Sequence, residues 1–465
     1  MYFKHFYDSD LAQSAYLIGC QSTGEAVVID AHRDIQMFLD DAKSQSLRIV
    51  AVLETHMHAD YLSGVREIAN ASGAKIYLSD EGNQDWKYGF EGQKMYDGDK
   101  LNIGNISIEF VHTPGHTLEH MSYLITDNAT ANAPGFFLTG DFVFVGDIGR
   151  PDLLDEAAGG IDTRFAGAKL LFESLKNKFL TLPDYVQVWP GHGAGSACGK
   201  SLGAIASTTV GYERNFGWWT QYINDDDYQS FEDALLSNQP DAPLYFARMK
   251  IQNKAGPAIL GKLEPLKEIP AIEIKDKIGK EIIFIDTGKF ESVREYVVTG
   301  AYMIPWGDKF LTYASWIIDS LKDERGIVLL AKNQIEADKM RRMLIRVGID
   351  NVIAFVSRIS ELSQEKAETI TADNLARLDK PYILDMRTKV DYHQGHIPKA
   401  KQMHVGRLMW NLDKLPRDKT IVSYCITGVT SLVGSSALRA NGFKVVELEG
   451  SFNSWRDKNL PIETS

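Results

Sequence analysis

The first 245 residues alternate short apolar runs with stretches in which apolar residues recur every three or four positions. The short runs predict strands at 15–18 and 26–29, and the periodic stretches predict helices at 35–42, 165–176, 207–219 and 226–237. This alternation of strands and helices indicates an α/β fold. Pro residues then recur between 240 and 270, which predicts a linker, and two segments of similar length follow it.

One polar segment, Thr-His-Met-His-Ala-Asp-Tyr at 55–61, follows the apolar run 49–53. Three other polar motifs also follow β-prone runs: Thr-Pro-Gly-His at 113–116, Thr-Gly-Asp at 139–141 and Pro-Gly-His at 190–192. Strands of one sheet can deliver such loops to one edge, so we expect the His and Asp side chains to converge, as metal coordination requires. A single buried His or Asp is more often structural. An ordered set predicts a metal site, because unpaired buried imidazoles and carboxylates are costly.

The order of these motifs resembles the signature of the metallo-β-lactamase superfamily, His-x-His-x-Asp-His followed by His, Asp and His on later loops. The resemblance runs from His56 to His192 and implies an αββα sandwich. One position departs from it, because Tyr61 stands where the superfamily usually has a His that binds a second metal. This difference weakens a dinuclear zinc site.

Without that ligand, the best remaining metal site consists of His56, His116 and Asp141, two imidazoles and a carboxylate. This set is typical of mononuclear non-haem Fe(II) oxygenases, whose metal keeps open positions for O2 and substrate. Within the superfamily it resembles the persulfide dioxygenases, whose Gly-Asp and Gly-Arg-x-Asp motifs occur here at 140–141 and 149–152. The resemblance implies one Fe(II) per chain. A second group of residues would orient the ligands and pass protons: His58, Asp60, Tyr61 and His192.

The C-terminal end resembles a rhodanese-type sulfurtransferase domain over its whole length. The matching motifs are Ile-Leu-Asp-Met-Arg at 383–387, Tyr-His-Gln-Gly-His-Ile-Pro at 392–398, Val-Ser-Tyr-Cys-Ile-Thr-Gly at 422–428, Gly450, Trp455 and Leu-Pro at 460–461. Cys425 occupies the nucleophile position, between a predicted strand at 420–424 and a predicted helix at 431–441. The loop after it would direct N–H groups at the sulfur and hold a thiolate or persulfide anion: Ile426, Thr427, Gly428, Val429 and Thr430.

Two features leave an alternative open for this C-terminal part. A buried apolar cysteine after a strand is common, so Cys425 could be structural and the domain a non-catalytic docking module. Thr430 stands where many rhodanese loops end in Arg, so this loop carries less positive charge.

Residues 268–360 resemble a degenerate copy of the same domain. The apolar runs at 282–286 and 327–330 parallel those at 382–385 and 420–423. This copy contains no cysteine, and it has Ala-Lys-Asn at 331–333 where the other copy has Tyr-Cys-Ile. We therefore expect an inactive rhodanese-like module that serves as a spacer or an oligomer interface.

The predicted organisation is a metallo-β-lactamase domain at 1–245, a linker at 246–267, the inactive module at 268–360 and an active rhodanese domain at 370–465. The chain has 465 residues, 44% hydrophobic and 24% charged, as in soluble globular proteins. Its three cysteines give no disulfide framework, no apolar run could cross a bilayer, and the N-terminus lacks signal-peptide features, so we expect a cytoplasmic protein. A net charge of −12 argues against nucleic acids and anionic membranes as partners.

Together the resemblances imply consecutive sulfur reactions, as in the multidomain persulfide dioxygenase and sulfurtransferase fusions of sulfide-oxidising bacteria. The iron site would oxidise the persulfide of coenzyme A, glutathione, bacillithiol or cysteine with O2 to sulfite and thiol. Cys425 would transfer sulfane sulfur to sulfite, giving thiosulfate. We expect a homo-oligomer that detoxifies sulfide. The alternative is a glyoxalase II-like thioester hydrolase, which needs two metals and the ligand that Tyr61 replaces.

Four other residues carry candidate chemistry near these sites. Cys198 lies on the loop of His192, so its thiol is either a packing group or a carrier of sulfur beside the metal. Arg150 and Arg214 are candidate anchors for a substrate carboxylate. Cys20, at the end of a predicted strand, is expected to be structural.

Overall fold

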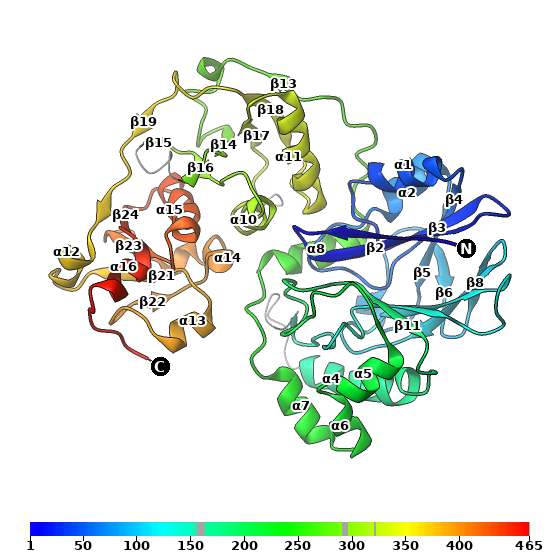
Figure 1. Ribbon diagram of the computed structural model, residues 1–465. Coiled ribbons are helices and arrows are strands. Elements are labelled where there is room, and N and C mark those ends of the chain that lie inside the picture. Colours follow the sequence, from blue (N-terminus) through cyan, green and yellow to red (C-terminus); the bar gives the residue numbers. More distant parts are fainter. Residues whose placement is uncertain (154, 156–162, 291–295, 320–321, 465) are drawn as a thin grey trace. The chain divides into compact units, whose positions relative to one another are not determined.

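Two compact units make up the computed structural model of the chain, which describes residues 1–153, 155, 163–290, 296–319 and 322–464 (Figure 1). Unit 1 comprises Met1–Ala242 and Phe246–Leu263, and unit 2 comprises Pro243–Tyr245 and Glu264–Ser465. Among the described helices, none has the length and apolar character needed to cross a membrane.

Unit 1 contains two six-stranded sheets. The first sheet consists, in spatial order, of β1 (Tyr2–Asp8), β2 (Gln13–Cys20), β3 (Glu25–Ile29), β4 (Arg48–Leu53), β5 (Lys75–Ser79) and β6 (Gln93–Met95). The second consists of β12 (Thr208–Thr209), β11 (Gln187–Pro190), β10 (Phe136–Gly140), β9 (Met121–Asp127), β8 (Ile106–His112) and β7 (Lys100–Ile103). The pairs from β3 to β6 and the pair β10–β11 are parallel, so several strands end at the same sheet edge.

Alternating side chains give each sheet two apolar faces. In β3, Val27 and Ile29 join the core between the sheets, whereas Ala26 and Val28 join the core under the first helices. In β10, Leu138 faces the other sheet and Phe137 faces the helices behind it. This period of two is the sequence pattern expected for a sheet buried on both faces.

Helices cover the outer faces of both sheets. On the first sheet these are α1 (Gln36–Ser44) and α2 (Val65–Ser72). On the second they are α4 (Thr163–Ser174) with the π-helical turn η2 (Leu175–Phe179), α5 (Val210–Phe216), α6 (Thr220–Asn224) and α7 (Tyr228–Leu236). A short 3-10 turn, η1 (Gln84–Trp86), lies between β5 and β6. The predicted αββα sandwich is therefore confirmed.

The stretch predicted as a linker, 246–267, contains most of helix α8 (Tyr245–Ala255). Residues Phe246–Leu263 belong to unit 1, where Arg66 donates hydrogen bonds to the carbonyls of Gly256 and Pro257. Pro240, Pro243 and Pro257 lie outside the helix rather than inside it, so the proline pattern marks the ends of α8 and not a free linker.

Unit 2 contains two five-stranded parallel sheets with equivalent strand order. The middle module carries β13 (Lys267–Glu268), β18 (Val352–Val356), β17 (Gly326–Leu330), β14 (Ile282–Asp286) and β16 (Tyr302–Met303), in that spatial order. The C-terminal module carries β20 (Thr369–Ile370), β24 (Val445–Leu448), β23 (Ile421–Tyr424), β21 (Tyr382–Asp385) and β22 (Lys401–Gln402). Taken in chain order, both sheets have the sequence first-fifth-fourth-second-third, which supports the internal duplication.

Helices complete both modules of unit 2. The middle module adds η3 (Ala271–Glu273), α10 (Phe310–Ile317), α11 (Gln334–Arg346) and the strand pair β15 (Val297–Val298) and β19 (Gln364–Glu365). The C-terminal module adds α12 (Ala372–Ala376), α13 (Lys389–Gln394), α14 (Val405–Leu408), η4 (Leu412–Lys414), α15 (Val429–Ala440) and α16 (Ser451–Asp457). Helix α10 packs against α14 and α15, so the two modules share an interface within one unit.

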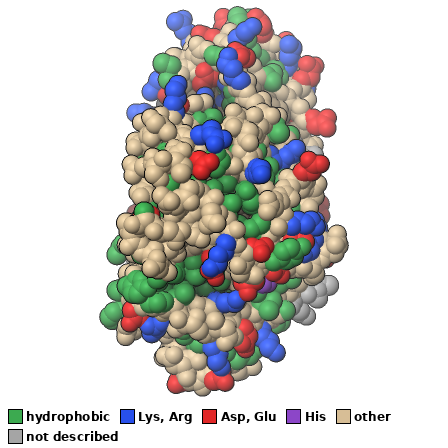
Figure 2. Space-filling model, turned by 90° about the vertical axis from the view of Figure 1, so that its right-hand side faces the viewer, with side chains coloured by type: hydrophobic (Ala, Val, Ile, Leu, Met, Phe, Trp, Pro, Cys, Tyr) green, Lys and Arg blue, Asp and Glu red, His purple; other side chains and the backbone are tan. Residues whose placement is uncertain are grey.

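Charged side chains of both signs are interspersed over the face drawn in Figure 2. Neither acidic nor basic residues form a continuous field on this face, although the chain as a whole carries a net charge of −12. The negative charge is therefore not concentrated in one patch of this face.

Candidate functional site

The predicted ligand loops of unit 1 all follow strand ends. His56 lies after β4 and His116 lies between β8 and β9. Asp141 follows β10 and His192 follows β11, the parallel neighbours in which Gly140 pairs with Pro190. Parallel pairing brings the two strand ends to one edge, and this is why residues more than fifty positions apart in sequence come together.

Three of these side chains form the tightest polar cluster. One Asp141 carboxylate oxygen, Oδ2, lies 3.8 Å from His56 Nε2 and 3.5 Å from His116 Nε2. All three residues are buried, and Oδ2 has no hydrogen-bond partner. Donor atoms about 2.1 Å from one metal ion lie roughly 3–3.6 Å apart, so the His116 distance fits a shared cation and the His56 distance is slightly longer. A buried carboxylate oxygen left unpaired is otherwise costly.

Hydrogen bonds on the far side of each imidazole aim its Nε2 at the cluster. His116 Nδ1 donates to the carbonyl of Arg150 at 2.8 Å. His56 Nδ1 lies 2.9 Å from Thr55 Oγ1, whose own hydroxyl hydrogen goes to Asp30 Oδ2 at 2.9 Å, so Nδ1 is the donor there. Both rings therefore present an unprotonated Nε2, the tautomer that a metal ligand requires.

Protonation states in the cluster also suit a cation. Burial, together with the nearby His58, lowers the pKa of His56 well below its usual range, and burial likewise lowers the pKa of His116. Burial alone would raise the pKa of Asp141, but the charge and hydrogen bond of His192 hold it well below its usual range. The site thus offers two neutral imidazoles and one carboxylate.

His192 lies between two carboxylates and is not oriented like the other imidazoles. Its Nδ1 is 2.7 Å from Asp141 Oδ1, and its Nε2 is 2.8 Å from Asp60 Oδ2. Burial would lower its pKa, but the negative charges of Asp141 and Asp60 raise it well above the usual value. His192 is therefore placed to hold a proton between Asp141 and Asp60.

Tyr61 and His58 form a stacked pair behind the cluster, with ring centroids 4.4 Å apart. The Tyr61 hydroxyl donates to the carbonyl of Asp30 at 3.1 Å and accepts from Gln13 Nε2 at 3.3 Å. His58 Nε2 lies 3.2 Å from Asp30 Oδ1, and this carboxylate offsets the effect of burial and raises the pKa of His58. The phenol is thus bonded to protein groups rather than directed at the cluster.

Two residues near the cluster were not found from the sequence. Asp30, in the left-handed region with φ 57°, receives a hydrogen bond from Thr55 N at 2.7 Å in addition to its bond with the Thr55 hydroxyl. His120 stacks on His56, accepts from Asp141 N at 3.1 Å and lies 2.8 Å from Thr113 Oγ1. His120 stands four residues after His116, a signal that could have placed it in the site. Asp30 has no such signal.

Helix α8 supplies a third unpredicted residue, Asn253. Its side-chain amide donates to the carbonyls of His58 and Tyr61, both at 2.7 Å, and accepts from Ser63 N at 2.9 Å. The side chain is buried. Asn253 thereby fixes the loop that carries His56 from a position almost two hundred residues away in sequence.

The predicted substrate-binding residues lie in different settings. The Arg150 guanidinium is buried and donates to Asp152 and to the carbonyls of Ala197 and Pro240. Arg214 donates to Asp184 and to the carbonyls of Leu180 and Leu182. These bonds give both arginines structural contacts, which differs from the predicted role as anion anchors.

Cys198 and Cys20 are both buried thiols of unit 1. The ligand atoms of Cys198, His192 and Asp141 lie within 4.8 Å of one another, and burial raises the pKa of the Cys198 thiol to about 12. Cys20 belongs to the core between the sheets, and its sulfur accepts from Asn105 N at 3.3 Å. The structure thus brings Cys198 to the candidate metal site and leaves Cys20 outside it.

In unit 2, the loop between β23 and α15 surrounds the sulfur of Cys425. Gly428 N donates to Sγ at 3.1 Å, and the hydroxyls of Ser431 and Ser451 lie 3.5 and 3.9 Å from it. Gly428 has φ 112°, a conformation that favours glycine, and it stands at the N-cap of α15 without a side-chain cap. The sulfur therefore lies at the N-terminus of α15, where it accepts from the backbone N–H of the N-cap residue.

The other predicted residues of this loop form its outer surface. Ile426 and Thr427 are exposed, and Val429 and Thr430 are half-buried. The carbonyls of Cys425 and Ile426 accept from the backbone of the first turn of α16. The loop is thus held on both sides, with the sulfur beneath it.

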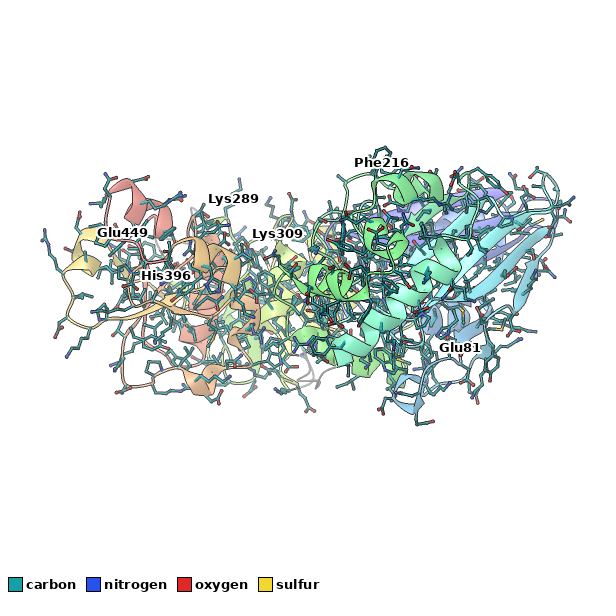
Figure 3. The ribbon with its side chains drawn as sticks, turned by 90° about the horizontal axis from the view of Figure 1, so that it is seen from below. Glu81, Phe216, Lys289, Lys309, His396 and Glu449 are labelled. Carbon is teal, nitrogen blue, oxygen red and sulfur yellow. The ribbon has the colours of Figure 1, made fainter. Side chains whose placement is uncertain are left out.

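The remaining motifs of the C-terminal module support this loop from below. Arg387 donates to Asp385 and to the Gly395 carbonyl, and Tyr424 donates to the same carboxylate. His396, labelled in Figure 3, stacks on Tyr392 with ring centroids 3.7 Å apart. These residues fix the end of β23 and do not contact the sulfur.

The corresponding loop of the middle module is closed by its own side chains. Asn333 caps α11 by accepting from Glu336 N at 3.0 Å, and the Glu336 carboxylate accepts from Lys332 N at 2.7 Å. This resembles a capping box, with the difference that Glu336 accepts from the residue before the N-cap. The helix N-terminus that accommodates a sulfur in the C-terminal module is therefore already satisfied here.

Comparisons with known proteins match both parts of the chain. Residues 8–192 match the family model described as Metallo-beta-lactamase superfamily, and residues 369–458 match the Rhodanese-like domain. A crystal structure described as a metallo-beta-lactamase from Staphylococcus aureus is 36% identical, covers 77% of this chain and 99% of its own, and superposes with a TM-score of 0.68.

Two curated relatives match part of the chain. An uncharacterized protein of Mycobacterium tuberculosis is 31% identical over 231 residues, which is 44% of this chain and 92% of that protein. The mitochondrial persulfide dioxygenase ETHE1 of Bos taurus is 28% identical over 185 residues, 38% of this chain and 62% of that protein. On this evidence the chain belongs to the metallo-β-lactamase superfamily and carries a rhodanese-like domain in its C-terminal part.

Proposed function

We propose that unit 1 is a persulfide dioxygenase that uses one Fe(II) per chain, and that unit 2 is a sulfurtransferase whose nucleophile is Cys425. The substrates of unit 1 are low-molecular-weight persulfides, those of coenzyme A, glutathione, bacillithiol or cysteine, together with O2. The products are sulfite and the thiol. Similarity to a persulfide dioxygenase over 185 residues supports this assignment.

One observation carries the metal assignment. Asp141 Oδ2 is buried without a hydrogen-bond partner and faces the Nε2 atoms of His56 and His116. Two imidazoles and one carboxylate are the typical facial set of a non-haem iron site with open positions. Tyr61, at the position of the usual second-metal ligand, has its hydroxyl bonded to the Asp30 carbonyl, which favours a single ion.

Residues of the chain orient the metal ligands, hold a proton beside them and exclude water. Bound iron supplies the unpaired electrons that allow O2 to react with a singlet substrate. Thr55 and the Arg150 carbonyl fix the tautomers of His56 and His116. His192 holds a proton at Nε2, facing Asp60, next to the carboxylate of Asp141. The burial of these groups excludes bulk water from the ligands.

The proposed reactions balance. In unit 1, persulfide, O2 and water give the thiol, sulfite and two protons. In unit 2, the outer sulfur of a second persulfide passes to the Cys425 thiolate, and the thiol part of that persulfide leaves as a thiolate. Sulfite then attacks the outer sulfur of the Cys425 persulfide, so that thiosulfate forms and the Cys425 thiolate returns. The donors around Sγ, Gly428 N and the Ser431 hydroxyl, suit an anionic sulfur.

Metal analysis tests the proposal directly. Protein reconstituted anaerobically with Fe(II) should contain about one iron per chain and should form sulfite from a supplied persulfide when O2 is admitted. Two zinc ions per chain with no oxygen uptake by the iron-loaded protein would contradict it.

A second candidate, a dinuclear thioester hydrolase of the glyoxalase II type, has one observation in its favour. The ligand atoms of Asp141, His192 and Cys198 also lie close enough together to hold an ion. Against this, both ring nitrogens of His192 already lie at hydrogen-bond distance from carboxylates. Hydrolysis of a glutathione thioester by the two-zinc protein, without persulfide oxidation by the iron protein, would favour this candidate.

A further inference from the structure

Helix α10 of the middle module reaches the loop of Cys425. Its N-cap, Lys309, labelled in Figure 3, is exposed, whereas the first residues of the helix, Phe310 and Leu311, are buried. One turn further along, Tyr313 is buried, and its hydroxyl lies 3.2 Å from the Thr430 hydroxyl. Thr430 belongs to the first turn of α15, directly after Gly428 and Val429.

Helix α15 belongs to the C-terminal module and also packs against the middle module, which fixes its position beside Tyr313. Leu432 of α15 is part of the middle module's own apolar core, and Ser436 accepts a hydrogen bond from Met303 N at 2.9 Å. Trp316, one turn after Tyr313, packs edge-on against His404 at 4.7 Å. The middle module therefore contacts the sulfur loop through fixed elements and does more than separate two domains.

The location of Thr430 makes this contact relevant to the sulfur. Gly428 N and the Ser431 hydroxyl, the two closest donors to Cys425 Sγ, lie on either side of it in the same turn. That turn has no side-chain cap of its own. In the middle module, by contrast, Asn333 and Glu336 hold the equivalent turn.

We infer that Tyr313 is a positioning residue of the Cys425 site, which holds the first turn of α15 through Thr430 so that its donors stay aimed at the sulfur. This inference rests on the proposed function of Cys425. The catalytically silent middle module thus contributes one residue to the site of its neighbour.

The electrostatic setting of Tyr313 agrees with this role. Burial raises the pKa of the phenol, the hydrogen bond with Thr430 lowers it, and the charge of Cys425 raises it again, with a net increase. The phenol therefore stays protonated, and either hydroxyl can be the donor in its hydrogen bond with Thr430.

Alkylation of Cys425 by iodoacetamide tests the inference without any sulfur transfer. In the full chain at neutral pH, the rate is measured for each cysteine separately by peptide mass spectrometry. We expect Tyr313→Phe and Thr430→Val each to slow alkylation of Cys425 about two- to tenfold, the range of one hydrogen bond, with the rate at Cys20 unchanged. The double variant should be no slower than either single one.

The matched control is Tyr296→Phe, an exposed tyrosine of the same module, which should leave the rate unchanged. Thermal unfolding of every variant separates a local change from loss of the fold, and Thr430→Val decides if Tyr313→Phe is unstable. Normal alkylation in both single variants, or effects that add in the double variant, would overturn the inference. A wild-type Cys425 that is alkylated but gains no sulfur from a persulfide would instead contradict the proposed function.

Discussion

The two candidate sites are built in opposite ways. In unit 1, His56, His116 and Asp141 come from three separate loops, and their buried polar atoms need a cation to be satisfied. In unit 2, one loop of consecutive residues surrounds Cys425, and its N–H and hydroxyl groups satisfy the sulfur without a metal. The first site is made by the fold of a whole domain, whereas the donors closest to the sulfur of the second come from one helix N-terminus.

This contrast predicts that a change at one site leaves the other site unaffected. A substitution among the three metal ligands should leave the Cys425 loop intact, because no residue is shared between the two compact units. A substitution in the loop should likewise leave the metal site intact. Variants of each site test this separation.

Replacing any one of His56, His116 or Asp141 by Ala should abolish iron binding and oxygen uptake. The loss should exceed the roughly 10–100-fold that the removal of an outer hydrogen-bond partner costs a metal site. Persulfide formation on Cys425 should persist at the wild-type level. Iron content, oxygen uptake and peptide mass spectrometry measure the three quantities.

His5→Ala is the matched control, since His5 is half-buried in unit 1 but bonded to Ser14 outside the cluster. Normal oxygen uptake in any of the three ligand variants would remove that residue from the site. Simultaneous loss of the Cys425 persulfide would break the separation of the two sites.

Cys425→Ser should reduce thiosulfate to the non-enzymatic background while sulfite continues to form and accumulates. The reason is that a serine hydroxyl cannot carry a persulfide, and the middle module offers Lys332 at the equivalent position. Chromatography of both anions under limiting O2 gives the ratio. An unchanged ratio would place sulfur transfer elsewhere, for example on Cys198 beside the metal.

A variant of the middle module tests whether its loop can hold an anionic sulfur. Lys332→Cys should gain no persulfide, because Asn333 and Glu336 already satisfy the turn that would have to hold an anionic sulfur. The unsubstituted chain, in which Lys332 offers no thiol, is the control, and Cys20→Ser serves as the control for the removal of a thiol in Cys425→Ser. Efficient persulfide formation on the new cysteine would show that the capped turn is no barrier.

Asp60→Asn should retain iron but lower oxygen turnover by about 10–100-fold, as is common for outer-sphere partners. The amide cannot match the charge with which Asp60 holds His192 at 2.8 Å. Turnover per bound iron separates this loss from a loss of metal. Full turnover in Asp60→Asn would exclude His192 and Asp60 as a proton-holding pair.

The smallest effect concerns stability. Asn253→Ala should destabilise unit 1 by about 1–3 kcal/mol, because the buried carbonyls of His58 and Tyr61 lose their donor. Chemical denaturation measures the change, and Asn224→Ala, at the exposed end of α6, is the control. An unchanged stability in Asn253→Ala would mean that α8 does not stabilise the loop that carries His56.

Local sequence signals predicted the parts of the molecule that depend on neighbouring residues. The period of two in β3 and the motif around Cys425 determine, respectively, which side chains enter the cores and where the sulfur loop begins. The ligand loops were predictable because each follows a strand that ends at one edge.

Contacts between distant residues were not predictable in the same way. Asp30 and Asn253 act through hydrogen bonds to loops far away in sequence, and neither residue lies in a recognisable motif. Prolines around 240–257 indicated a linker, yet they flank α8, whose docking depends on Arg66 and Asn253. The contact of Tyr313 with Thr430 likewise depends on how two modules pack, which no local pattern records.

Oxygen uptake by the iron-reconstituted protein tests most directly whether unit 1 is a persulfide dioxygenase. The full chain, loaded anaerobically with Fe(II), is mixed with the persulfides of coenzyme A, glutathione, bacillithiol and cysteine, and O2 and sulfite are followed together in Cys425→Ser, where sulfite is not consumed. We predict that at least one persulfide is oxidised with about one sulfite formed per O2 consumed. No oxygen uptake with any of them, from protein that holds about one iron per chain, would contradict it.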